Sequence, residues 1–157
     1  VLEPRTPAKL LDALDIHKDE LVLDIGSGFG YSSAVISLIA EVVIAVEDDS
    51  SLASEAEEIL SEIGADNVVV QVGKLEDGAP EHGPYDVIIL QGGVGRIPGS
   101  VLRQLKNGGR IGAIFIEEGL GTAKIGFKLN DKITWRYLFN AAAPVLPGFF
   151  KQKDFAL

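Results

Sequence analysis

The sequence predicts an α/β fold: a doubly wound, mostly parallel, Rossmann-like sheet with a C-terminal β-hairpin. First, short β-branched runs alternate along the chain with stretches of helical periodicity. Second, a glycine cluster joins the first of these runs to the helix that follows it. Third, two alternating runs near the end are separated by a short polar turn, which is typical of a hairpin.

The expected helices carry apolar residues three and four positions apart. Thr6 and Pro7 suggest an N-cap and first helical position, which would begin a helix at the start of the chain. Three later helices are expected at residues 31–40, 52–63 and 97–105. The first of these is apolar nearly all round, which predicts a buried helix, and the other two end at glycine.

The expected strands are short apolar runs bounded by glycine or acidic residues. They cover residues 21–25, 41–46, 67–72, 85–90 and 110–116. The hairpin is expected over 123–129 and 133–139, with Asn130 and Asp131 in its turn. The stretch from Ala141 contains two prolines and a glycine, so we expect it to be irregular.

A chain of 157 residues fits a single domain, here residues 1–157. The sequence has no methionine even at position 1, so we expect that residues before Val1 are missing. It has no cysteine, which excludes disulfides, thiolate metal sites and a cysteine nucleophile. His17 and His82 are too few for a histidine-rich metal centre, and no metal is expected.

The formal charge of −9 disfavours binding to nucleic acid, because an acidic surface repels phosphates. No membrane span is expected: the most apolar stretch, residues 34–46, is interrupted by Ser37 and Glu41 and is shorter than the ~20 residues a span needs. The opening residues do not resemble a signal peptide. These features favour a cytoplasmic location.

The glycine cluster is the strongest functional signal. Gly26, Gly28 and Gly30 lie between a predicted strand and a predicted helix, at the carboxyl end of the first strand, where such folds bind ligands. Glycine lets the backbone turn tightly and approach a ligand closely. Asp24 and Ser27 belong to the same segment. The cluster therefore predicts a binding loop.

The glycine spacing distinguishes two ligands. A dinucleotide fingerprint needs G-x-G-x-x-G, but Tyr31 occupies the position of its third glycine. The observed G-x-G-x-G is typical of enzymes that bind S-adenosylmethionine. The negative charge of Asp24 would disfavour a pyrophosphate and favour a cationic sulfonium and an α-amino group.

Glu47 follows the second strand and is the candidate acceptor for hydrogen bonds from both ribose hydroxyls. The alternative is that Glu47, Asp48 and Asp49 only place negative charge at the start of the next helix. We assign the helix role to Asp48 and Asp49 and the ligand role to Glu47, because the glycine loop lies one element upstream.

Several segments together resemble the protein-L-isoaspartate O-methyltransferases. They are the motifs at residues 23–31, 67–73, 84–89 and 97–110, and the ending at 139–149 resembles a divergent bacterial branch. The resemblance implies a class I methyltransferase fold, S-adenosylmethionine as methyl donor, and transfer to the carboxylate of L-isoaspartyl residues in damaged proteins. The implied partner is therefore a protein or peptide, and the implied role is protein repair.

The sequence departs from the family at the substrate side. Leu2 falls where the family has a serine. We also expect the chain to lack the N-terminal segment that helps to enclose the peptide substrate in the family. Arg5 and Thr6 lie beside that position and are the candidates for holding an acceptor carboxylate, although Thr6 as a helix cap and Arg5 as a solvated residue is the alternative.

The cofactor side matches better. Gly73 is followed by Lys74 where the family often has aspartate, so adenine would lie near Lys74 and Leu75. Gln91, with Gly92 and Gly93, follows the fourth strand, where glycine could let substrate or the methionine tail approach, although a plain turn is the alternative. The predicted cofactor residues are Asp24, Gly26, Ser27, Gly28, Gly30, Glu47, Lys74, Leu75 and Gln91.

Other functions remain open from the residues alone. They are a methyltransferase of the same fold with a different acceptor, favoured by Leu2 at the serine position, and a non-catalytic protein that only binds the cofactor. A nicotinamide-linked oxidoreductase is disfavoured by the position of Gly30. The sequence does not give the oligomeric state.

Overall fold

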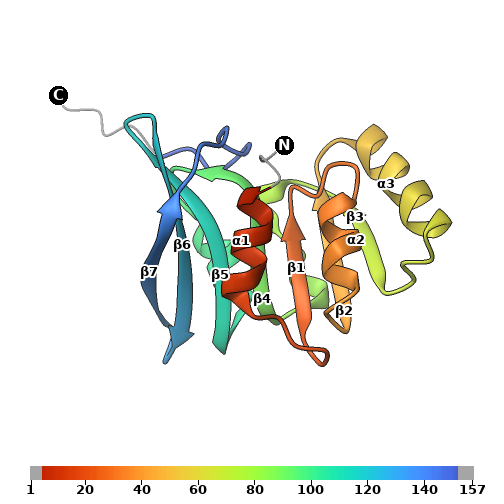
Figure 1. Ribbon diagram of the computed structural model, residues 1–157, viewed down its shortest axis with the longest axis horizontal. Coiled ribbons are helices and arrows are strands. Elements are labelled where there is room, and N and C mark those ends of the chain that lie inside the picture. Colours follow the sequence, from red (N-terminus) through yellow and green to blue (C-terminus); the bar gives the residue numbers. More distant parts are fainter. Residues whose placement is uncertain (1–4, 152–157) are drawn as a thin grey trace.

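The computed structural model describes residues 5–151, which form one seven-stranded sheet with helices on both faces (Figure 1). The strand order across the sheet is β3-β2-β1-β4-β5-β6-β7. The strands are β1 (Leu21–Ile25), β2 (Val42–Glu47), β3 (Val68–Val72), β4 (Tyr85–Val94), β5 (Leu105–Glu117), β6 (Leu120–Leu129) and β7 (Lys132–Asn140). The first five are parallel, whereas β6 is antiparallel to both β5 and β7. The predicted fold class is confirmed.

Helices and short turns cover the two faces of the sheet. They are α1 (Arg5–Leu14), α2 (Tyr31–Ser37), α3 (Ser50–Glu62), α4 (Gly99–Leu102) and the 3₁₀ turns η1 (Leu75–Asp77) and η2 (Pro80–His82). Leu10, Leu14 and Ile36 from α1 and α2 pack on one face. The opposite face is covered by η1, α4 and residues 145–149 of the C-terminal segment, whose Phe149 is fully buried.

The central strand β1 is buried on both faces and positions the glycine loop. Val22, Leu23 and Ile25 are fully buried, as expected for a parallel strand covered on both faces. β1 pairs with β2 on one side and β4 on the other, so the carboxyl ends of three strands meet at one edge. The glycine loop begins at that edge.

The helix predicted at residues 97–105 is much shorter in the structure. Only Gly99–Leu102 is helical, and Leu105 already begins β5, because it pairs with Tyr85 and is buried in the core. The Lys128 ammonium donates hydrogen bonds to the carbonyl oxygens of Leu102 and Leu105, at 3.0 and 2.8 Å. These bonds satisfy carbonyls that a longer helix would have paired internally.

The prediction of a buried helix at 31–40 is wrong in both length and burial. The helix α2 ends at Ser37, and the Asn67 amide caps that end by donating to the carbonyl oxygens of Ser37, Ala40 and Glu41. Only one face of α2 meets the sheet, so Tyr31 is 67% exposed and other apolar side chains of this segment also face outward. The apolar residues of 31–40 therefore form both the face that packs on the sheet and part of the exposed surface.

The predicted hairpin is confirmed. Asn130 and Asp131 have φ values of 52° and 62°, as a two-residue type I′ turn requires, and they join β6 to β7. The segment 141–151 is irregular, as expected, but it is anchored: Gly95 and Arg96 donate backbone hydrogen bonds to the carbonyl oxygen of Phe149. Within residues 5–151, no helix meets the length and hydropathy that a membrane span requires.

Candidate functional site

The glycine loop folds over the carboxyl ends of β1 and β2. Gly26, Gly28 and Gly30 have φ values of 81°, 56° and 90°, a region that other residues rarely adopt. The backbone N–H groups of Gly26 and Ser27 both donate to the carbonyl oxygen of Val46, at 2.9 and 3.3 Å. The loop is therefore fixed to β2 by its own backbone.

The three glycines serve different purposes. A Cβ at Gly26 would lie 3.3 Å from the Leu146 side chain, and a Cβ at Gly30 would lie 3.1 Å from the Ala56 Cβ on α3. Among residues 5–151, no atom outside Gly28 and its two chain neighbours lies within 4 Å of the position where Gly28 would carry a Cβ. Gly30 therefore allows α2 to pack against α3, and Gly28 leaves open space beside the loop.

A cavity of about 660 Å³ begins at this loop. We call its first wall the loop side: Gly26, Ser27, Gly28, Phe29, Glu47, Asp48, Asp49, Leu52 and Leu75. We call the part of the lining that comes from α1, α2 and the C-terminal segment the apolar side: Pro7, Ala8, Leu11, Tyr31, Val35, Leu146 and Pro147. Ser32 and Gln91 complete the lining. The volume suits a small organic ligand.

Ser27 leaves a polar atom without a partner. Its side chain is only 6% exposed, and its Oγ forms no hydrogen bond within residues 5–151. Buried hydroxyls are normally paired, since leaving one unpaired costs about 1–3 kcal/mol. Because Ser27 lines the cavity, its hydroxyl is available to a ligand.

The Glu47 carboxylate links the two loops of the site. One oxygen, Oε1, accepts a hydrogen bond from the Gly28 N–H at 3.0 Å, and Oε2 accepts one from the Asp49 N–H at 2.8 Å. Its side chain is 5% exposed, and this burial raises its pKa above the ordinary value. Each oxygen retains acceptor capacity for a ligand hydroxyl.

The helix-capping role falls to Asp49. This residue is the N-cap of α3, and its Oδ1 accepts hydrogen bonds from the N–H groups of Ser51 and Leu52, at 2.9 and 3.1 Å. Asp48 lines the cavity beside Glu47 and makes no such cap. The structure therefore separates the roles of the three adjacent acids, and Glu47 is not merely a helix cap.

Asp24 lies beneath the loop and does not line the cavity. It is fully buried and accepts hydrogen bonds from the hydroxyls of Ser32 and Ser33, at 2.7 and 2.6 Å, and from the Gln91 amide at 2.9 Å. No cation balances the carboxylate among these partners, and burial raises its pKa. Asp24 therefore fixes α2 and Gln91 relative to β1, and Gln91 reaches the cavity in its place.

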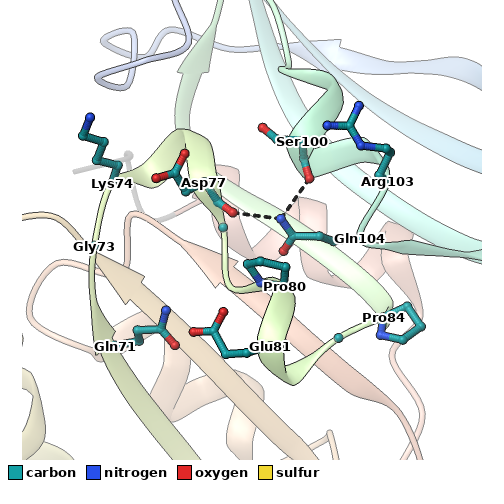
Figure 2. Close-up of a pocket in the computed structure, with 12 residues that line it drawn as sticks. Gln71, Gly73, Lys74, Asp77, Pro80, Glu81, Pro84, Ser100, Arg103 and Gln104 are labelled. Atoms are coloured by element: carbon teal, nitrogen blue, oxygen red, sulfur yellow. Dashed lines mark hydrogen bonds between the residues drawn. The ribbon is translucent and has the colours of Figure 1, made fainter.

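The remaining predicted residues divide between inside and outside the cavity. Leu75 is buried and lines it, whereas Lys74 borders a separate cavity of about 880 Å³ on the far side of η1 (Figure 2). Arg5 does not line the glycine-loop cavity, and neither does Thr6, which is buried inside α1 rather than capping it, since that helix begins at Arg5. Leu2 lies outside the described residues.

The apolar side is the part of the cavity that sequence reasoning missed. Leu146 lies against two glycines that are far from it in the chain: a Cβ at Gly92 would be 2.6 Å from its Cδ2 atom. A Cβ at Gly93 would be 2.6 Å from the Ile116 side chain. Gly92 and Gly93 therefore make room for protein side chains, which corrects the expectation that they admit a ligand. The apolar residues at 145–149 could have indicated a buried segment, but they do not indicate which part of the fold this segment packs against.

Residues 1–133 match the family model described as protein-L-isoaspartate(D-aspartate) O-methyltransferase (PCMT). A relative named protein-L-isoaspartate O-methyltransferase from Syntrophus aciditrophicus is 33% identical over 135 residues, which are 83% of this chain and 62% of that protein. The chain therefore spans less than two thirds of this curated relative.

Solved structures agree with this match. A structure named protein-L-isoaspartate O-methyltransferase superposes with a TM-score of 0.86 at 28% identity, over 92% of this chain and 47% of that one. A Plasmodium falciparum structure described as a protein of the same kind, in complex with S-adenosyl-L-homocysteine, gives 0.77 at 19% identity, over 93% and 75% of the two chains. The second likeness shows a shared fold.

Proposed function

Since the chain belongs to the protein-L-isoaspartate O-methyltransferase family, we propose that it is an S-adenosylmethionine-dependent O-methyltransferase whose acceptor is the carboxylate of an L-isoaspartyl residue. The observation that carries the proposal is a single cavity in which the open backbone at Gly28 faces the Glu47 carboxylate. The bound product of the Plasmodium protein, S-adenosyl-L-homocysteine, belongs to the same ligand class.

The residues of the loop side fit a nucleoside. Glu47 would accept hydrogen bonds from ribose hydroxyls, and the unpartnered Ser27 hydroxyl would bond a polar group of the ligand. Leu52 and Leu75 offer apolar contact to an adenine ring. Gln91, held by Asp24, would contact the methionine part of the ligand. Of the two residues near which adenine was expected, Leu75 lines this cavity and Lys74 lines the other.

Charge favours a sulfonium over a dinucleotide. The ionisable acids that line the cavity are Glu47, Asp48 and Asp49, and no lysine, arginine or histidine lines it within residues 5–151. A pyrophosphate would face like charges at short range, whereas a positively charged sulfur would be attracted. The acidic loop side therefore supports S-adenosylmethionine over NAD.

The residues of the site suffice for the proposed chemistry. S-adenosylmethionine supplies an activated methyl group when bound. A carboxylate acceptor is already ionised at neutral pH, so no general base is required. The work of the protein is then to orient the two reactants and to exclude water, which the apolar side achieves with aliphatic and aromatic side chains.

Titration calorimetry tests the binding step. S-adenosyl-L-homocysteine should bind with a measurable affinity, and NAD⁺ should not. Binding of NAD⁺ in preference would refute the proposal. Transfer is then tested with radiolabelled S-adenosylmethionine and a pair of peptides that differ only in an L-isoaspartyl or an ordinary aspartyl residue, and label should enter only the first.

One observation favours a second candidate, a methyltransferase of the same fold with a different acceptor. The apolar side offers no cation to a carboxylate, and neither Arg5 nor Thr6 lines the cavity. An uncharged acceptor with an apolar body would fit this wall better. Labelling of such small molecules, with no labelling of the isoaspartyl peptide, would select this candidate.

A non-catalytic homologue is the remaining alternative, and it predicts binding of S-adenosyl-L-homocysteine with no transfer to any acceptor. The role in protein repair is a proposal that follows from the family resemblance, and the peptide assay is its first test. The cytoplasmic location is a proposal that rests on the sequence features given above. Fractionation of cells that express the chain would test it.

A further inference from the structure

The two edges of the sheet are protected differently. β3 and β7 are the outermost strands at opposite margins (Figure 1). β7 carries Lys132 and Arg136, and its pairing with β6 has an irregular register near Ala123. Charges and irregularities of this kind discourage further strand pairing. β3 has neither: its sequence is Val-Val-Val-Gln-Val, and its pairing with β2 is regular.

The free backbone groups of β3 follow from its bonds to β2. The Asn67 carbonyl accepts a hydrogen bond from the Val43 N–H, and the Gly73 N–H donates to the Glu47 carbonyl, at 2.9 and 3.1 Å. Successive residues of a strand face opposite sides, so residues 68, 70 and 72 direct their N–H and C=O groups away from the sheet. No hydrogen bond to these groups occurs within the described part of the chain.

The side chains at this edge are also exposed. Val69 is 44% exposed and Val72 is 53% exposed, although both are β-branched residues that pack well between strands. A short, apolar, uncharged edge with free backbone groups is suited to pairing with another strand. The question is which strand is complementary to it.

We infer that β3 pairs antiparallel with β3 of a second copy of this chain, about a two-fold axis at Val70. A centre at any one residue from 68 to 72 sets free groups of one strand against free groups of the other, whereas a centre between two residues does not. A centre at Val70 uses all three residues on each strand, because Val68 then lies opposite Val72 of the second copy. This register gives six backbone hydrogen bonds, two for each such pair.

Charge supports the same register. With the centre at Val70, Asp66 of each copy lies opposite Lys74 of the second copy, at both ends of the paired strands. Both residues are exposed, and neither side chain forms an ion pair within residues 5–151. The chain is therefore self-complementary in charge as well as in backbone groups, and this complementarity favours a second copy over an unrelated strand.

The exposed Val69 also gains a partner. In this register Val69 lies opposite Gln71 of the second copy, on the face of the sheet that carries the cavity shown in Figure 2. The frame of this cavity is fixed, because the Gln104 amide donates to the carbonyl oxygens of Asp77 and Ser100 and accepts from the Ala79 N–H. Gln71 lines this cavity, so Val69 would be covered at the margin of the cavity when the copies pair.

Analytical ultracentrifugation of the chain tests the inference, from micromolar to millimolar concentration. The wild type should show a reversible monomer–dimer equilibrium. Val70→Pro removes the central outward N–H without removing a bond to β2, so this variant should stay monomeric while circular dichroism shows the same fold. A wild type that is monomeric throughout, or a dimer that persists in Val70→Pro, would overturn the inference.

A charge reversal tests the register. Asp66→Lys places two lysines opposite each other and should weaken the dimer about tenfold. The double variant Asp66→Lys/Lys74→Asp restores opposite charges and should recover the wild-type dissociation constant. An equal weakening of the single and double variants would exclude this register. Because the readout is mass, the result does not depend on whether the proposed methyltransferase function is correct.

Discussion

The loop side and the apolar side of the cavity are built in different ways. The polar groups of the loop side come from two neighbouring loops, at residues 26–30 and 47–49, that follow adjacent strands. The apolar side combines α1 and α2, which lie early in the chain, with Leu146 and Pro147 from the C-terminal segment. A short motif can therefore encode the loop side, whereas the apolar side forms only when distant segments come together on the folded sheet.

The largest expected effect is at the loop side. Gly28→Val should abolish binding of S-adenosyl-L-homocysteine, measured by calorimetry, because the new side chain enters the open space and φ is 56° there. Gly108→Val is the matched control: Gly108 has φ of 88° and open space around it, but it does not line the cavity. Equal loss of binding in both variants would mean that backbone strain alone is responsible.

The apolar side should respond through stability. Phe149→Ala should lower the free energy of unfolding by about 3–5 kcal/mol in urea denaturation, because the Phe149 ring is fully buried and anchors the segment that carries Leu146. The adjacent Phe150 is 65% exposed, so Phe150→Ala should change stability by less than about 0.5 kcal/mol. A small effect at both positions would show that the segment is not held as described.

A smaller effect is expected for the acid that faces the glycine loop. Glu47→Ala should weaken binding of S-adenosyl-L-homocysteine by about 1.5–3 kcal/mol in calorimetry, the usual contribution of hydrogen bonds to a charged group. Glu62→Ala removes a carboxylate from the far end of α3 and should leave the affinity unchanged. Unchanged affinity in Glu47→Ala would mean that Glu47 does not bind the ligand and only holds the backbone of Gly28 and Asp49.

The smallest effect concerns the buried acid beneath the loop. Burial raises the pKa of Asp24 above 3.8, so the folded state binds a proton that the unfolded state has released. This contribution to stability is complete below pH 3.8 and is lost as pH rises through the raised pKa. The stability of wild type relative to Asp24→Asn should therefore fall with rising pH, by at most about 1.4 kcal/mol per pH unit. A difference that rises with pH in urea titrations would contradict this sign.

The strands and the hairpin were predictable because their signals are local. Val22, Leu23 and Ile25 make β1 apolar apart from Asp24, and the turn at Asn130-Asp131 needs residues that tolerate positive φ. The helix predicted at 97–105 was wrong because strand β5 begins at Leu105, within the stretch that has helical spacing. The hydrogen bond from Lys128 that favours the strand comes from a distant position in the chain. Local preference lost to tertiary pairing there.

The candidate site divides in the same way. The acidic and glycine residues of the loop side were identified from the sequence, and the structure places Ser27, Gly28 and Glu47 around one cavity. It removes Lys74 to a second cavity and Asp24 to a supporting position, distinctions that depend on the direction of a side chain rather than on the identity of a residue. Spacing along the chain does not encode that direction.

The sequence by itself determined the parallel sheet, the glycine loop and the acid after the second strand, because backbone conformation and strand burial depend on residues close together in the chain. Tertiary structure alone decided that Leu146 fills the space beside Gly26 and Gly92, and that β3 is left as an uncharged edge. Packing contacts and strand order join segments that are distant in the chain. These contacts stabilise the protein only once those segments lie together in the fold.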